Sequence, residues 1–310
     1  LHVIFGTGPV GCWIAQKLIE QNQKVRAINR TGKRPDLLPE GVELRAADVT
    51  NPQLAVAAAE GAGTIYQALN PPYHLWHQFF PALQKGALEA AKATGASYIS
   101  IENLYMYNAS VPITETSPIA PQSKKGELRT KMAEEVLNAH LKGDVRAVLL
   151  RSSDYYGPGV LGSALGERVF GKLVLGQKAE LGGSATTPHA WAYIEDVAKA
   201  AITLASNEKA FGKVWISPHA PAVTQAEVVE KTARILGREA KFTVISPLMM
   251  RLAGFFIPEA RASVEMMYEF TKPFLVDSSQ IELGFGLHAT PVGTGLEKTV
   301  TWYQSHLAKA

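Results

Sequence analysis

The first 150 residues alternate between short apolar runs and segments whose apolar residues recur every three or four positions. Apolar runs of this length predict buried strands, and the longer period predicts helices that pack on them. The predicted strands are 3–5, 25–29, 42–47, 64–69, 97–101 and 145–150, and the predicted helices between them are 10–19, 54–59, 79–94 and 132–140. This alternation predicts an α/β fold with a doubly wound, mostly parallel sheet, which binds ligands at the carboxyl ends of its strands.

Three glycines follow the first predicted strand with the spacing G-x-G-x-x-G. Gly6 permits a tight turn, Gly8 lets the backbone approach a phosphate, and Gly11 lets the helix pack closely on the strand. The motif alone is a weak signal, but its place between a strand and a helix favours a Rossmann-type pyrophosphate site. The predicted contacts are Gly6, Gly8, Pro9, Val10 and Gly11, and the alternative is a purely structural glycine turn.

The end of the second strand bears on the choice of dinucleotide. An acidic residue there usually binds the ribose 2′-hydroxyl of NAD, but this strand ends at Asn29 and is followed by Arg30, Lys33 and Arg34. Arginine suits a 2′-phosphate, so NADP(H) is favoured over NAD(H). The alternative is a solvated basic loop.

Residues after the third and fourth strands belong to the same predicted edge. Asp48 and Val49 follow the third strand, and Leu69 and Asn70 end or follow the fourth. We expect these four residues to contact the dinucleotide, with Asp48 at the adenine. The alternative for Asp48 is a turn residue before a helix.

After Gly159 the pattern becomes irregular and rich in glycine, and helices return at 194–206, 225–236 and near 260–270. We predict a dinucleotide-binding domain over 1–159 that also receives about 188–218. Residues 160–310 then form most of a smaller, interleaved substrate-binding region. A stretch rich in Met and Phe lies in this region, and such side chains form cores or line pockets for apolar ligands.

The amino-acid composition and the net charge limit the classes of molecule that the protein is expected to bind. The 310 residues are 46% hydrophobic and 19% charged, with a net charge of +3 and no long run of Lys or Arg. We therefore expect a small-molecule substrate rather than nucleic acid or a membrane. Cys12 is the one cysteine, no run reaches the ~20 apolar residues of a membrane span, and the sequence opens directly into a strand. These features predict a cytoplasmic protein without a signal peptide. We expect no metal, because no ligand cluster has metal spacing, and a homodimer is kept as an alternative.

Four segments carry a resemblance to a known family. They are the glycine turn, 47–49 (Ala-Asp-Val), 151–159 (Arg-Ser-Ser-Asp-Tyr-Tyr-Gly-Pro-Gly) and 192–198 (Ala-Tyr-Ile-Glu-Asp-Val-Ala). With them the chain resembles the extended short-chain dehydrogenases/reductases of the NAD-dependent epimerase/dehydratase group. The first turn looks like that of the atypical members.

The resemblance implies a catalytic Ser and a Tyr and Lys spaced Y-x-x-x-K. Lys131 fits the lysine, but Glu127 stands where the tyrosine belongs, and Ile101 takes the serine position with Ser100 before it. Glu127 is the acid if burial raises its pKa, or Tyr105 or Tyr107 supplies a phenol, or Lys131 acts alone and mainly binds the cofactor. The alternative for Glu127 is an exposed residue of a first helical turn.

Three functions follow from this pattern. The favoured one is an NADP(H)-dependent oxidoreductase that acts on a small or apolar carbonyl or enone compound. The first alternative is a non-catalytic NAD(P)-binding redox sensor, which the missing tyrosine favours. The second is a nucleotide-sugar epimerase or dehydratase, which the absence of a diphosphate-binding arginine in 187–193 disfavours. His189 in this run is a weak candidate base or ligand, with a structural histidine as the alternative.

Overall fold

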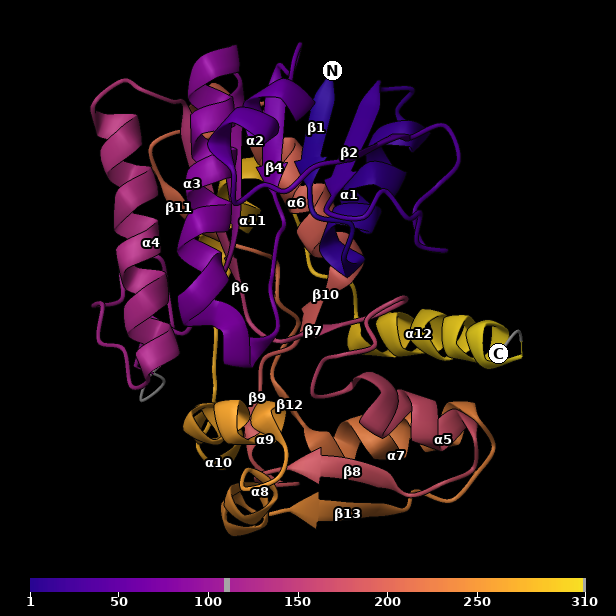
Figure 1. Ribbon diagram of the computed structural model, residues 1–310. Coiled ribbons are helices and arrows are strands. Elements are labelled where there is room, and N and C mark those ends of the chain that lie inside the picture. The colour runs from indigo at the N-terminus through magenta and orange to yellow at the C-terminus, as the bar shows by residue number, and fades with distance from the viewer. Residues whose placement is uncertain (109–111, 309–310) are drawn as a thin grey trace. The chain divides into compact units, whose positions relative to one another are not determined.

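The computed structural model describes residues 1–108 and 112–308 (Figure 1). The chain folds into two compact units. Unit 1 comprises 1–106, 124–152 and 197–217, and unit 2 comprises 107–123, 153–196 and 218–310.

Unit 1 is built on a seven-stranded sheet in the order β11-β6-β5-β4-β1-β2-β3, and every neighbouring pair is parallel. The strands are β1 (His2–Phe5), β2 (Val25–Asn29), β3 (Glu43–Ala46), β4 (Thr64–Gln67), β5 (Ser97–Asn103), β6 (Ala147–Ser152) and β11 (Val214–Ile216). The helices are α1 (Pro9–Glu20), α2 (Pro52–Ala58), η1 (Tyr73–Leu75), α3 (Trp76–Thr94), α4 (Lys124–Leu141), α6 (Ile194–Ala205), of which residues from 197 belong to this unit, and η3 (Glu208–Ala210). The predicted Rossmann-type α/β fold is confirmed.

Helices cover both faces of this sheet. Alanines of α2, α3 and α4 pack in one apolar cluster with Val3 and Phe5 of β1, and Figure 1 shows these three helices along the sheet. Ile4 points to the opposite face, because side chains alternate along a strand. There it meets α1, since a Cβ on Gly11 would lie 3.2 Å from the Ile4 side chain.

Two elements of unit 1 differ from the sequence prediction. The helix predicted at 132–140 begins eight residues earlier, at Lys124, because its first two turns carry charged residues that hide the apolar period. The strand β11 was not predicted, since three residues are too short for a pattern.

Unit 2 contains paired short strands and many short helices. Its strands are β7 (Tyr155–Tyr156), β8 (Ala179–Gly182), β9 (Pro188–His189), β10 (Ala192–Tyr193), β12 (Val223–Thr224) and β13 (Phe242–Ile245). Its helices are η2 (Gly166–Gly171), α5 (Lys172–Val174), α7 (Gln225–Ile235), α8 (Pro247–Ala253), α9 (Pro258–Ser263), η4 (Val264–Met266), α10 (Tyr268–Thr271), α11 (Ser279–Phe285) and α12 (Val292–Leu307). The helix predicted near 260–270 is therefore three short pieces.

The stretch rich in Met and Phe divides into a buried and an exposed part. Met250 and Met267 pack in a small apolar cluster, whereas Phe255 and Phe256 are 80% and 89% exposed. These two phenylalanines face solvent, so their placement gives no support to an apolar substrate.

Glu269 of α10 is fully buried in unit 2. Burial, assisted by the charge of Asp154, raises the pKa of the Glu269 carboxyl well above its ordinary value. The native state then holds this proton to higher pH than the unfolded state does. The stability of the fold therefore falls as pH rises from the unfolded pKa toward the folded one.

The variant Glu269→Gln removes this titration without changing the shape of the side chain. We expect the thermal midpoint of the variant to rise relative to wild type as the pH is raised from about 5 to about 8. Glu230→Gln, at an exposed position of α7, serves as the control and leaves the pH dependence unchanged. Parallel melting curves for wild type and Glu269→Gln across this range contradict the prediction.

Candidate functional site

The glycine turn between β1 and α1 has the geometry that a phosphate site requires. Gly6 adopts a φ of +105°, and a Cβ there would lie 2.7 Å from the carbonyl oxygen of Ala68. A Cβ on Gly11 would lie 2.0 Å from the carbonyl oxygen of Gly6. Both positions therefore require glycine. Gly8 differs from these two glycines, because a Cβ on Gly8 would meet no atom within 4 Å.

The open space beside Gly8 lies at the amino end of α1. Gly8 is the N-cap residue, Pro9 is the first helical residue, and no side chain caps the helix. The amide groups of Val10 and Gly11 are in the first turn, where backbone N–H groups have no partner within a helix. An exposed, uncapped helix start of this kind suits an anion, so these residues fit a dinucleotide pyrophosphate.

Asn29 organises the loop that follows β2. Its amide nitrogen donates to Thr7 Oγ1 at 3.0 Å and to the carbonyl of Lys33 at 2.9 Å. Its oxygen accepts from the backbone N–H groups of Thr31 and Gly32. A carboxylate at this position has no hydrogen to give to Thr7 or Lys33, so the loop geometry itself favours asparagine.

The three cations after β2 are not equivalent. Arg34 donates to the carbonyl oxygens of Pro39 and Val42 and holds its own loop. Arg30 and Lys33 are exposed, and in the described part of the chain no hydrogen bond or ion pair engages either side chain. Arg30 and Lys33 are therefore the two cations that remain for a phosphate ligand.

Asp48 is an exposed turn residue before α2. Its Oδ1 accepts from the Thr50 hydroxyl at 2.7 Å and from the Thr50 amide at 3.0 Å. These bonds lower the pKa of Asp48, and the nearby charge of Arg30 adds to the effect. The next residue, Val49, is buried under α3, because a Cβ on Gly86 would lie 1.8 Å from the Val49 carbonyl oxygen. Leu69 is half-buried after β4, and Asn70 beside it is exposed.

The first turns of α4 place the charged residues on two opposite faces. Glu127 and Lys131 are exposed, whereas Lys125 and Arg129 are 3% and 1% exposed. The buried face of α4 continues with Met132, Ala133 and Val136. Glu127 therefore lacks the burial that its proposed acid role requires, and Lys131 points with it toward solvent. Lys125 and Arg129 are themselves four residues apart, so they occupy the Y-x-x-x-K spacing on the buried face.

Arg129 belongs to a buried ion cluster between α4 and the sheet. The Arg129 guanidinium lies 3.6 Å from Glu102 Oε1, and Arg151 of β6 lies 3.1 Å from Glu102 Oε2. Ser100 donates to Glu102 Oε1 at 3.1 Å. The hydroxyl of Ser100 is thus held by this cluster, and one carboxylate serves two guanidinium groups.

Lys125 lies in an aromatic surrounding at the carboxyl edge of the sheet. Its Nζ is 5.4 Å from the centre of the Tyr73 ring, and the Tyr73 hydroxyl is hydrogen-bonded to the hydroxyl of Tyr105. Trp76 stacks on Tyr105 with ring centres 6.0 Å apart. Tyr73 follows β4, Tyr105 follows β5, and Lys125 is the second residue of α4. Ligands of doubly wound sheets bind at this edge.

Sequence reasoning did not single out Lys125. The available signal was a second pair of charged residues with i, i+4 spacing, Lys125 and Arg129, two residues before Glu127 and Lys131. Periodicity could not choose between the two pairs, because both consist of polar residues. Tyr107 is 1% exposed, and its backbone forms a bridge with Ile119, which fits a packing role.

Cys12 has a structural environment. It is buried in α1, its thiol donates to the Thr7 carbonyl at 3.3 Å, and burial raises the pKa of the thiol to about 12. A thiol in this state is inert as a nucleophile.

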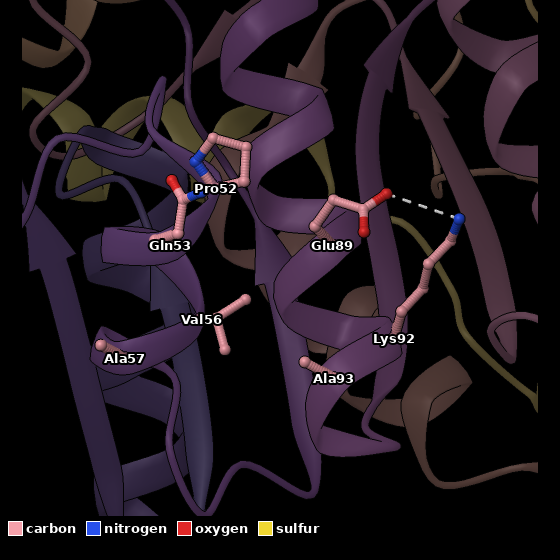
Figure 2. A pocket seen from close by; sticks show the side chains of 7 residues that line it. All are labelled: Pro52, Gln53, Val56, Ala57, Glu89, Lys92 and Ala93. Atoms are coloured by element: carbon pink, nitrogen blue, oxygen red, sulfur yellow. Dashed lines mark ion pairs between the residues drawn. The ribbon is translucent and has the colours of Figure 1, made fainter.

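A separate groove lies between α2 and α3 (Figure 2). Its side chains include the pair formed by Glu89 and Lys92 at 3.5 Å, and Lys92 also pairs with Asp144. No residue of the glycine turn or of α4 lines this groove. We therefore place the candidate site at the glycine turn and around Lys125.

Two features are absent from residues 1–108 and 112–308. No group of three or more His, Cys, Asp or Glu side chains is arranged to hold a metal ion. No helix there combines the length and the hydropathy of a membrane span.

Comparisons with known proteins bear on this fold and site. A family model described as "NAD dependent epimerase/dehydratase family" matches residues 3–216. No curated protein sequence matches the chain.

Solved structures share the whole fold at low identity. The epimerase Mth375 of Methanothermobacter thermautotrophicus has a TM-score of 0.83 and 13% identity, with 99% of this chain and 93% of that chain covered. The structure of UDP-glucuronic acid 4-epimerase of Bacillus cereus, with UDP-glucuronic acid and NAD, has a TM-score of 0.79 and 16% identity. The match covers 98% of this chain and 99% of that chain. The structure of dTDP-glucose 4,6-dehydratase of Bacillus anthracis, with NAD, has a TM-score of 0.80 and 14% identity. The match covers 98% of this chain and 96% of that chain. At these identities the likeness shows the fold alone.

Proposed function

The chain belongs to the NAD dependent epimerase/dehydratase family, and from this premise we propose that it is an NADP(H)-dependent oxidoreductase acting on a small or apolar carbonyl or enone compound. In this proposal unit 1 binds the dinucleotide and unit 2 supplies most of the substrate contacts. The observation that carries the proposal is Lys125, a buried ammonium group among aromatic side chains at the carboxyl edge of the sheet.

The residues of the glycine turn fit the pyrophosphate, and Arg30 and Lys33 fit a 2′-phosphate. When bound, the nicotinamide supplies or accepts a hydride. Asn29 supports the choice of NADP(H), because its side chain is engaged within the loop and carries no charge that repels a phosphate. Asp48 lies near Arg30 and is held by Thr50, which leaves it as a candidate contact of the adenine side.

Lys125 is proposed to stabilise negative charge on the substrate oxygen. A carbonyl oxygen gains negative charge when its carbon accepts a hydride, and a positioned cation in a poorly hydrated site stabilises that charge. Lys125 is buried beside the Tyr73 ring, and Trp76 packs against Tyr73 and Tyr105 to extend this aromatic wall. Such a wall suits a small or apolar carbonyl compound or enone.

The nucleotide-sugar alternative is favoured by one finding. Several similar structures hold UDP-glucuronic acid or UDP-glucose together with NAD. Against it stands the run 187–193, which contains no arginine for a diphosphate.

A substrate panel separates the three functions. NADPH oxidation is measured with aldehydes, ketones and enones, and the conversion of UDP-glucuronic acid and dTDP-glucose is measured beside it. We expect turnover with the carbonyl panel. Conversion of a nucleotide sugar alone favours the epimerase alternative, and tight NADPH binding without any turnover favours the sensor.

The cofactor preference predicts an unequal effect of Arg30→Ala. A charge-assisted hydrogen bond contributes about 1.5–3 kcal/mol, so NADPH affinity falls about 10- to 100-fold while NADH affinity stays within about threefold. Lys24→Ala, at an exposed position before β2, is the control. Calorimetric titration with both dinucleotides measures the effect. An equal loss for NADPH and NADH contradicts the role of Arg30, and tighter binding of NADH by wild type contradicts the preference.

A further inference from the structure

An exposed apolar surface lies on α8 and on the turn that joins α8 to α9 in unit 2. Residues 247–258 contain a single polar side chain, that of Arg251. Contiguous apolar surface exposed to water marks a site of interaction with a protein or a membrane. Six side chains, each 49–89% exposed, form the apolar patch: Leu248, Met249, Leu252, Phe255, Phe256 and Ile257.

The helix α8 is apolar on two sides. On one side, Met250 and Ala253 pack with Ala260 of α9, and Figure 1 shows α8 beside α9. On the other side lie the first three residues of the apolar patch, which are exposed. A helix that is apolar all round is normally buried all round. The core of unit 2 covers only the inner side of α8, so the outer side lacks the apolar surroundings that its sequence suits.

The backbone of the turn after α8 is already hydrogen-bonded. The N–H groups of residues 254–257 donate to carbonyl oxygens of residues 250–253 at 2.9 to 3.2 Å. Pro258 follows and has no N–H group. An N–H group without a partner is costly in a medium that offers no acceptor. The turn can therefore enter a layer without water and leave no amide donor unsatisfied.

Two arginines border the apolar patch. Arg251 lies within α8, and Arg261 of α9 lies next to the turn, because a Cβ on Gly254 would be 2.9 Å from the Cα of Arg261. Both arginines are exposed, and none of the described residues forms an ion pair or a hydrogen bond with either guanidinium group. Guanidinium groups bind phosphate and carboxylate groups, so the border of the patch suits an anionic surface.

Charge and hydrogen bonding favour a lipid surface over a second copy of the chain. In a two-fold contact the same patch meets itself, which brings two Arg251 side chains to one interface with no carboxylate from 247–258. A protein interface also carries about ten direct hydrogen bonds, and the patch has one polar side chain to supply them. Acyl chains need no hydrogen bonds, and they deform around the projecting rings of Phe255 and Phe256.

We propose that the apolar patch binds the surface of a membrane that contains anionic lipids. Phe255 and Phe256 lie among the acyl chains, and Arg251 and Arg261 lie at the level of the headgroup phosphates. Apolar helix faces bordered by cations bind membranes in this way, and α8, with seven residues, lies on the membrane without spanning it. The inference is independent of the proposed function, since it uses no residue of the dinucleotide site.

The composition of the chain predicts no binding to a membrane, and the proposal departs from that expectation. The expectation depends on the net charge of all 310 residues, which is +3. A patch of twelve residues with one charge hardly changes this total, so the composition carries no information about it.

The first test is sedimentation of the full chain with vesicles of phosphatidylcholine and phosphatidylserine. We expect wild type to sediment with them, and the double variant Phe255→Ser with Phe256→Ser to lose at least about tenfold in affinity, because each buried Phe contributes about 1.5–3 kcal/mol. Leu283→Ser is the control, since Leu283 is 86% exposed on α11 outside the patch. Equal sedimentation of wild type and the double variant overturns the proposal, as does a wild type that stays in solution.

The arginines are tested with vesicles of two compositions. We expect Arg251→Gln to lower the affinity for the vesicles with phosphatidylserine about fivefold, because one cation near an anionic surface contributes about 1 kcal/mol. Binding to vesicles of phosphatidylcholine alone stays unchanged in this variant. An equal loss of affinity for both kinds of vesicle contradicts the role of the anionic headgroups.

The second test locates the contact. Cys12 is buried, so a cysteine at an exposed position is the one that reacts with an environment-sensitive fluorophore. On adding the vesicles with phosphatidylserine, we expect the emission of labelled Phe256→Cys to shift to the blue and that of labelled Leu283→Cys to stay unchanged. No shift at position 256 overturns the proposal. A wild-type dimer that ignores vesicles, and that dissociates in the double serine variant, also overturns it and assigns the patch to a contact between copies of the chain.

Discussion

Gly8→Val abolishes the binding of NADP(H) and NAD(H) and leaves the fold intact. The new side chain enters the open space beside the helix start, because a Cβ there meets no atom within 4 Å. The φ of −72° and ψ of −179° at Gly8 are extended values that valine adopts readily. We expect a loss of at least about 100-fold in dinucleotide affinity, or about 3 kcal/mol, measured by calorimetry, with an unchanged thermal midpoint.

Two other glycines give the controls. Gly293→Val, at the start of α12, also places its Cβ where nothing lies within 4 Å, and we expect unchanged binding and stability. Gly11→Ala forces a Cβ to 2.0 Å from the Gly6 carbonyl, and we expect a loss of stability. Undiminished dinucleotide binding in Gly8→Val contradicts the assignment of the glycine turn.

Most of the sheet of unit 1 was predictable because strands such as β1, β5 and β6 are buried on both faces. A strand covered by helices on either side is a continuous apolar run, as in 3–5 and 147–150, and such runs stand out in a sequence. The family was predictable as well, because the glycine turn and two further motifs are local in sequence. The predicted fold class and family are both confirmed.

The site on α4 could not be predicted by the same reasoning. Binary patterning assigns charged residues to the solvent face of a helix, but Lys125 and Arg129 are buried there and Glu127 is exposed. Burial of Arg129 depends on Glu102, which comes from another element. Partners so distant in sequence leave no periodic signal. The roles of Glu127, Lys131, Tyr105 and Ser100 in catalysis stay predictions, and the exposure of the first two argues against them.

The pair Asp154 and His189 shows the same limit in unit 2. Each residue lies in a segment without periodicity, and 35 positions of chain separate them. His189 has no distinguishing neighbour along the chain, whereas the fold surrounds it with three aromatic rings and a carboxyl group. Residues in short, irregular elements of this kind have contacts that can be identified only in the three-dimensional structure.

Lys125→Met lowers turnover while the dinucleotide still binds. Methionine keeps the length and burial of the side chain, and it removes the ammonium that is proposed to stabilise the substrate oxygen. Removing one such donor costs about 10²- to 10³-fold in kcat. The fold tolerates the change, because an apolar side chain of similar volume replaces a buried charge without loss of stability in many proteins. Steady-state kinetics measure kcat, and NADPH titration and thermal melting accompany them.

Lys131→Met is the matched control, since it makes the same substitution six residues further along α4 at an exposed position. We expect its kcat to stay within about twofold of wild type, because a surface charge contributes little to a buried site. The opposite result, with kcat lost in Lys131→Met and retained in Lys125→Met, assigns the role of the family lysine to Lys131. It contradicts the proposal that Lys125 stabilises the substrate oxygen. Equal activity of both variants and wild type contradicts the role of Lys125 and leaves Tyr105 as the candidate group at the substrate oxygen.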